Sequence, residues 1–284
     1  MSIKKGVLNT DDKNYPELLK SIDKPPEKLN YKGDFQSVFL ENTLAVVGSR
    51  KMTSYGKMVT EKLVREVSSC GITIVSGFMY GVDALAHQTA IENNGKTIGV
   101  LPCGVDVIHP AYQKKLYQQL LRNGFFVSEY DDNMPPERWT YPKRNRITIG
   151  LSQATLVIEA AEKSGSIISA ELAKKYNRKL FAVPGSVFSE TSAGTNKLLK
   201  EGATPVTCAQ DILSFFDKEE GTLFEEMELS PEESEIMEIL KQSPHETDEI
   251  VRKTKKPATV VGETLSSLEM KGVIKKEGRL YYPL

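Results

Sequence analysis

The sequence lacks the features that would place the protein in a membrane or equip it with a metal. Its 284 residues contain no apolar run of the roughly 18 residues that a membrane span needs, and the start has no apolar stretch typical of a signal peptide. The only three cysteines, Cys70, Cys103 and Cys208, form no C-x-x-C pair. We therefore expect no zinc site and no disulfide framework, and a reducing cytoplasm as location.

Two common nucleotide-binding motifs are also missing. Gly48-Ser49-Arg50 follows an apolar run, as a phosphate-binding turn does, but the further glycines of G-x-G-x-x-G are replaced by Arg50 and Thr53. No G-K-[ST] follows, so a Walker loop is excluded as well. The segment is either a phosphate-binding turn or a plain tight turn with a surface arginine.

Charge is divided unevenly along the chain. The net charge is −1, but residues 1–217 carry 27 Lys and Arg against 23 Asp and Glu, while residues 218–284 carry 10 against 15. The larger part is thus mildly basic at +4 and the smaller part acidic at −5. A nucleic-acid surface would have to be local rather than global.

Alternating apolar runs and helical spacings predict an α/β fold with a parallel sheet. Residues 1–40 predict one short helix and an extended segment, and residues 41–216 a Rossmann-like core. Gly48, Gly77 and Gly185 follow predicted strands, where ligands bind in such sheets. The predicted strands are 43–47, 72–75, 97–101, 125–128, 155–159 and 180–183, and the predicted helices are 54–69, 82–93, 112–122, 147–152 and 166–176.

The last part of the chain predicts a second domain. Residues 217–229 form an acidic linker, and residues 230–284 predict three helices and a hairpin, the plan of a winged helix. Its helices are expected at 230–241, 247–254 and 258–271, and its hairpin strands at 273–276 and 279–282. Basic residues favour DNA binding by this domain, but its acidic first helix is equally consistent with protein contacts.

Residues 141–146, Tyr-Pro-Lys-Arg-Asn-Arg, combine an aromatic ring with three cations just before a predicted helix. A ring that stacks on a base beside cations that bind phosphates is how single-stranded nucleic acid is held without sequence readout. Arg138 and Trp139 lie close by in the sequence, which favours nucleic-acid contact over a solvated basic turn. A second candidate is Asp83 with His87, an acid–base pair on one helical face or simply a helix-start acid and a packed histidine.

Several segments occur together in the order found in the DprA/Smf family of DNA-processing proteins. They are Gly48-Ser49-Arg50, residues 76–87, 141–146 and 164–166, and Ala182-Val183-Pro184-Gly185 followed by Gly194-Thr195-Asn196. The resemblance covers roughly residues 14–216, and the winged helix also occurs in that family. It implies an extended Rossmann-like core that binds single-stranded DNA, forms a homodimer and delivers strands to the RecA recombinase in natural transformation, without catalysis or a nucleotide cofactor.

The resemblance also indicates which residues act. Arg50, Arg144 and Arg146 would belong to the DNA pocket, and Tyr141 would face a base where phenylalanine is most frequent. The apolar segment near the end of the core would contribute to the dimer through Leu198, Leu199, Val206, Ile212 and Phe215. The full set of DNA-binding candidates is Gly48, Ser49, Arg50, Ser76, Gly77, Arg138, Tyr141, Lys143, Arg144, Asn145, Arg146, Ser164 and Gly165.

Two other functions remain open. Nucleotide phosphoribohydrolases share this architecture, but their P-G-G-x-G-T signature is absent, since Pro184-Gly185 continues as Ser186-Val187-Phe188. A regulator that binds duplex DNA through the winged helix is the other alternative.

Overall fold

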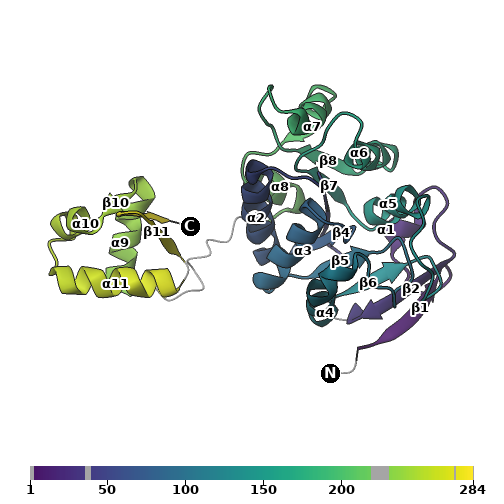
Figure 1. Ribbon diagram of the computed structural model, residues 1–284, viewed down its shortest axis with the longest axis horizontal. Coiled ribbons are helices and arrows are strands. Elements are labelled where there is room, and N and C mark those ends of the chain that lie inside the picture. The colour runs from purple at the N-terminus through teal and green to yellow at the C-terminus, as the bar shows by residue number, and fades with distance from the viewer. Residues whose placement is uncertain (1–2, 36–39, 219–229, 272, 284) are drawn as a thin grey trace. The chain divides into compact units, whose positions relative to one another are not determined.

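The computed structural model describes residues 3–35, 40–218, 230–271 and 273–283. The chain forms two compact units, Met1–Glu220 and Gly221–Leu284, shown in Figure 1. Most of the predicted acidic linker lies outside the described residues. Within the described part of the chain, no helix has the length and apolar character required to cross a bilayer.

A nine-stranded sheet forms the centre of the first unit, in the order β1-β2-β6-β5-β4-β3-β7-β8-β9 (Figure 1). From β6 to β9 all neighbours are parallel, which confirms the predicted Rossmann-like architecture. The chain runs outward from β3 to β6 on one side and returns to place β7 beside β3. The strands are β1 Lys5–Asn9, β2 Lys28–Gly33, β3 Thr43–Val47, β4 Thr73–Ser76, β5 Thr97–Val100, β6 Gly124–Ser128, β7 Ala154–Val157, β8 Lys179–Ala182 and β9 Thr204–Pro205.

Helices cover both faces of the sheet because the central strands are apolar on both sides. In β3, Leu44 and Val46 pack with residues of α2, α3 and α8, whereas Ala45 and Val47 pack with residues of α5, α6 and α7. The helices are α1 Glu17–Lys20, α2 Ser54–Ser69, α3 Val82–Glu92, α4 Lys114–Asn123, α5 Thr140–Gly150, α6 Gly165–Lys175, α7 Glu190–Lys200 and α8 Gln210–Leu213.

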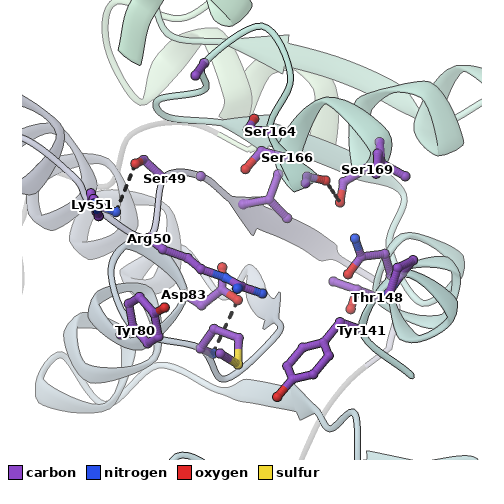
Figure 2. A pocket seen from close by; sticks show the side chains of 18 of the residues that line it. Ser49, Arg50, Lys51, Tyr80, Asp83, Tyr141, Thr148, Ser164, Ser166 and Ser169 are labelled. Atoms are coloured by element: carbon purple, nitrogen blue, oxygen red, sulfur yellow. Dashed lines mark hydrogen bonds between the residues drawn. The ribbon is translucent and has the colours of Figure 1, made fainter. Parts of the chain in front are cut away.

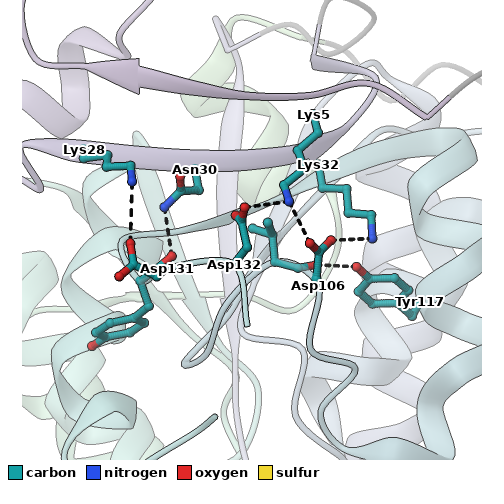
Figure 3. A network of polar contacts seen from close by, with 10 residues as sticks. Lys5, Lys28, Asn30, Lys32, Asp106, Tyr117, Asp131 and Asp132 are labelled. Atoms are coloured by element: carbon teal, nitrogen blue, oxygen red, sulfur yellow. Dashed lines mark hydrogen bonds and ion pairs between the residues drawn. The ribbon is translucent and has the colours of Figure 1, made fainter. Parts of the chain in front are cut away.

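The N-terminal residues differ from the sequence prediction, which contained a helix and an extended segment but no strands. β1 and β2 extend the sheet in antiparallel fashion, with β2 paired to β6. Ion pairs attach them to the loops after β5 and β6, as Figure 3 shows. Lys5 binds Asp106 (2.7 Å) and Asp132 (2.6 Å), and Lys32 binds Asp106 (2.8 Å). These contacts fix the loop that leads to His109.

The second unit has the predicted winged-helix plan. It contains α9 Pro231–Gln242, β10 His245–Glu246, α10 Thr247–Thr254, α11 Ala258–Met270, β11 Ile274–Glu277 and β12 Leu280–Pro283. The strands form a sheet in the order β10-β12-β11. Helix α9 starts with a capping box in which the Ser230 hydroxyl accepts from Glu233 N–H and the Glu233 carboxylate accepts from Ser230 N–H. Glu233 also accepts from Ser267 and Lys271, both at 2.7 Å.

This network predicts acid sensitivity of the winged helix. The hydrogen bond from Lys271, together with those from Ser230 and Ser267, lowers the pKa of Glu233 from its ordinary 4.5 to about 2. A carboxyl group whose pKa is lower in the folded than in the unfolded chain stabilises the folded state at every pH above the unfolded pKa. This stabilisation is lost as the pH falls from about 4.5 toward 2. Thermal unfolding of the full chain should show the winged-helix transition moving to lower temperature over this range.

A Glu233→Gln variant should be less stable than the wild type at pH 7. Its unfolding temperature should also fall less steeply between pH 5 and 3. An equally steep decline in the variant would assign the acid sensitivity to other groups.

Candidate nucleic-acid interface

A cavity of about 630 Å³ lies beside the carboxyl ends of β3 and β7, where the strand order reverses. This is the position at which open α/β sheets bind ligands, and the size is within the usual range of about 300–1,000 Å³. Its walls come from the loop after β3, the loop before α3, the first turns of α5 and the start of α6 (Figure 2). The described lining is Val47, Gly48, Ser49, Arg50, Lys51, Met79, Tyr80, Asp83, Tyr141, Pro142, Arg144, Asn145, Thr148, Ala161, Ser164, Gly165, Ser166, Ile168, Ser169 and Thr191.

The loop that carries Arg50 is held by the start of α3. Val82 N–H donates to the Ser49 carbonyl (3.2 Å). Gly81, with φ 82°, lies so close to this loop that a Cβ would meet the Ser49 carbonyl and Arg50 Cα. Because a side chain there would be both strained and obstructed, glycine is needed to bring Arg50 to the cavity.

Arg50 lies between two aromatic rings at the cavity. Its guanidinium carbon is 5.7 Å from the centre of the Tyr80 ring and 5.6 Å from that of Tyr141, and Figure 2 shows the three side chains converging. A hydrogen bond of 2.8 Å joins the Tyr141 hydroxyl to His109 Nε2. Burial, and secondly the charge of Arg50, lower the pKa of His109, which favours the neutral imidazole.

Beneath this layer, Arg144 is buried with 5 % of its surface exposed. Its guanidinium packs against Gly77, where any Cβ would overlap it, and it donates to the Thr148 hydroxyl (3.4 Å). Burial lowers the pKa of Arg144, and the negative charge of Asp83 partly offsets this shift. Burial raises the pKa of Asp83, and the positive charge of Arg144 partly offsets that shift in turn. The two groups therefore stabilise each other's charged forms under the cavity.

The opposite wall is the N-terminus of α6. Ser164 is its N-cap residue but makes no side-chain capping bond, and its buried hydroxyl has no hydrogen-bond partner among the described residues. Ser164, Gly165 and Ser166 all line the cavity, and Figure 2 shows Ser164 and Ser166 across from Arg50. Free N–H groups at a helix start bind anions, so this wall is suited to a phosphate.

Three predicted cations lie elsewhere. The sequence placed residues 141–146 before a short helix at 147–152, and this was wrong: α5 begins at Thr140 and includes them. Consecutive residues in a helix point about 100° apart. Lys143 (3.3 Å) and Arg146 consequently pair with Glu129, and the exposed Arg138 is not among the described lining residues.

The predicted residues of β4 and α3 have structural contacts. The Ser76 hydroxyl donates to the Val46 carbonyl (2.6 Å) beneath the cavity. His87 is fully buried with its Nδ1 2.6 Å from the Thr97 hydroxyl, and burial lowers its pKa to about 3. An acid–base pair with Asp83 is therefore not formed.

Comparison with known proteins finds matches to both units of the chain. The family described as "DNA recombination-mediator protein A" matches residues 6–217, and the "DprA winged helix domain" matches residues 224–278. The chain belongs to the DprA/Smf family. The DNA processing protein DprA of Bacillus subtilis is 39 % identical over 207 residues, which cover 73 % of this chain and 70 % of the relative.

Two solved DprA structures have the same fold. The X-ray structure of DprA from Streptococcus pneumoniae is 37 % identical with a TM-score of 0.71 and 74 % of each chain covered. A DprA structure from Helicobacter pylori is 34 % identical with a TM-score of 0.68, covering 76 % of this chain and 98 % of that one. This second structure concerns the single-stranded DNA binding mode of the Helicobacter pylori protein.

The expected dimer residues differ in exposure. Leu198, Val206 and Ile212 are buried in the core at 3 %, 1 % and 0 % exposure. Leu199 is half-buried, whereas Phe215 is 41 % exposed. Only Leu199 and Phe215 of this set have surface to offer a second copy.

Sequence reasoning missed several residues that line this cavity. Tyr80 lies in the loop after β4, and a tyrosine three residues after Gly77 was the signal available in the sequence. His109 lies in the loop after β5, and nothing in the sequence connects it to Tyr141. Lys51 and Thr191 also line the cavity.

The buried arginine predicts a large stability effect. Arg144→Ala removes the positive charge beside buried Asp83 and leaves space against Gly77, so it should lower the free energy of unfolding by about 3 kcal/mol. Arg138→Ala, at an exposed position, should change it by less than about 0.5 kcal/mol. Urea unfolding of both variants measures the difference. Equal small effects would show that Asp83 does not depend on Arg144.

Proposed function

We propose that this protein binds single-stranded DNA in the cavity, protects incoming strands and helps to load RecA onto them during natural transformation. The observation that carries the proposal is Arg50 between the rings of Tyr80 and Tyr141, opposite the α6 N-terminus. This arrangement offers aromatic faces for bases and two separate groups for phosphates. Single strands present both, whereas a duplex keeps its bases stacked inside.

In this proposal the backbone is held by Arg50 and by the N–H groups of Gly165 and Ser166. Gly48 and Ser49 bring the strand close to the main chain, and Asn145 and Ser164 supply polar contacts. Tyr141 stacks on a base, and Arg144 with Gly77 and Ser76 supports the floor. Lys143 and Arg146, paired with Glu129, act at most outside the cavity.

Binding rather than catalysis is favoured by the state of the acidic groups. Glu159 accepts from Thr53 N–H (2.9 Å), the Thr53 hydroxyl (2.6 Å) and the Thr191 hydroxyl (3.3 Å). It therefore holds Thr53, the N-cap residue of α2, and Thr191 of α7. Asp83 is engaged electrostatically with Arg144. Neither is placed as the free acid that a phosphoribohydrolase requires.

Duplex reading by the winged helix is less well supported. Helix α11, the second helix of its helix-turn-helix, carries Glu263 and Glu269 and contains neither lysine nor arginine. A helix that enters the major groove lies close to phosphates and normally carries cations. We therefore propose that this domain contacts protein, and that the homodimer involves Leu199 and Phe215.

Arg50→Ala should weaken binding to oligo-dT and oligo-dA alike, because a phosphate contact carries no sequence information. The slope of log affinity against log salt should flatten by about 0.7, the value for one phosphate contact on a single strand. Fluorescence anisotropy over a salt series measures both.

The matched control is Arg122→Ala, which removes one exposed arginine from the end of α4. It should retain the wild-type affinity and slope. If Arg50→Ala also retains them, Arg50 is not at the DNA.

Tyr141 tests the stacking role. Tyr141→Ala should weaken single-strand binding by about 1–3 kcal/mol. Tyr141→Phe keeps the ring and loses only the hydrogen bond to His109, so its effect should be small. A loss in the phenylalanine variant as large as in the alanine variant would mean that the hydroxyl, rather than the ring, binds DNA.

A further inference from the structure

Two adjacent apolar side chains are almost completely exposed in the loop between β8 and α7. Phe188 has 96 % and Val187 84 % of its surface exposed, the highest values among the described large apolar side chains. Neither residue contributes to closing the core. Single exposed apolar residues are common on proteins, so the surroundings of this pair decide its meaning.

The backbone that displays the pair is held in place. Gly185 N–H donates to the side chain of Asn196 in α7 (3.2 Å), which donates back to the Gly185 carbonyl (3.0 Å). Phe188 N–H donates to the Ser186 hydroxyl (3.2 Å), and Ser189 N–H donates to the Ser186 carbonyl (3.1 Å). The ring thus projects outward from a fixed turn.

The same loop adjoins the DNA cavity. Thr191, three residues after Phe188, lines the cavity and donates to Glu159. The Tyr55 hydroxyl of α2 donates to the Pro184 carbonyl at the other end of the loop (2.8 Å). The hydroxyl of Ser189, which follows Phe188, lies 2.9 Å from the Thr191 hydroxyl, so a hydrogen bond joins the turn that carries the pair to the cavity rim.

A strand bound in the cavity must continue over the surface, since single-strand-binding domains cover about 4–16 nucleotides, more than a cavity of about 630 Å³ encloses. We propose that Phe188, flanked by Val187, is a second stacking platform, which holds a base of the strand where it leaves the cavity past Thr191. This inference rests on the proposed single-strand binding. A nucleobase is the occupant that fits best because an exposed ring beside a nucleic-acid pocket offers both faces for stacking.

Binding of a long and a short oligonucleotide distinguishes the contribution of Phe188 from that of the cavity. Phe188→Ala should weaken binding of a 15-nucleotide oligo-dT by about 5- to 150-fold, the range expected for losing one stacked base. The affinity for a three-nucleotide oligo-dT, which is confined to the cavity, should be unchanged. Phe188→Tyr should restore the long-oligonucleotide affinity, and Met58→Ala, which removes another exposed apolar side chain, should have no effect.

A direct readout uses the fact that Trp139 is the only tryptophan. In a Trp139→Phe background, a Phe188→Trp substitution should give emission that long oligo-dT quenches and the trinucleotide does not. Unchanged emission, with unchanged long-oligonucleotide affinity in Phe188→Ala, would overturn the platform. A change in sedimentation of Phe188→Ala without a change in DNA affinity would instead make the ring a protein contact and likewise overturn it.

The two proposals fail in different ways. If the wild-type chain binds neither oligonucleotide, single-strand binding itself is wrong. If the wild type binds both and Arg50→Ala weakens both while Phe188→Ala weakens neither, only the second platform is wrong.

Discussion

The pocket depends on a charge that the fold buries. Arg144 lies under the cavity against Gly77, with Asp83 as its electrostatic counterpart. A buried guanidinium is tolerated only when its charge is compensated, and the carboxylate of Asp83 in α3 provides part of this compensation. Helix α5 in turn carries Tyr141, and the start of α3 holds the Arg50 loop. The buried guanidinium thereby packs α5, which carries Tyr141, against the loop after β4, which carries Tyr80.

A second buried polar group, Glu159, connects several elements near the end of β3. Glu159, at 2 % exposure, binds Thr53 at the start of α2 and Thr191 at the start of α7. Its carboxylate satisfies N–H and hydroxyl groups that would otherwise be unpaired at these ends. The loop that carries Phe188 is thereby joined through Thr191 and Glu159 to Thr53, which follows the Arg50 loop.

The N-terminal strands β1 and β2 are joined to the core by ion pairs as well as by the sheet. Lys5 and Lys32 converge on Asp106, whose pKa they lower, and each ion pair is partly solvated and individually worth little. Their combined effect is to hold the loop after β5, which contains His109. His109 in turn is hydrogen-bonded to the Tyr141 hydroxyl, so these contacts connect the N-terminal strands to the cavity lining.

The sequence by itself determined the parallel sheet, the winged helix and the family, because apolar runs, helical spacing and motif order are local properties. It predicted β3 and α2 with their observed bounds and brought Arg50 and Tyr141 to one site. It missed β1 and β2, since each of these partly exposed strands contains only two large apolar side chains. Only the tertiary structure decided that Arg144 is buried and Arg146 pairs with Glu129. Neighbouring cations that resemble one patch in sequence point in different directions once they are part of a helix, and burial then assigns each a different partner.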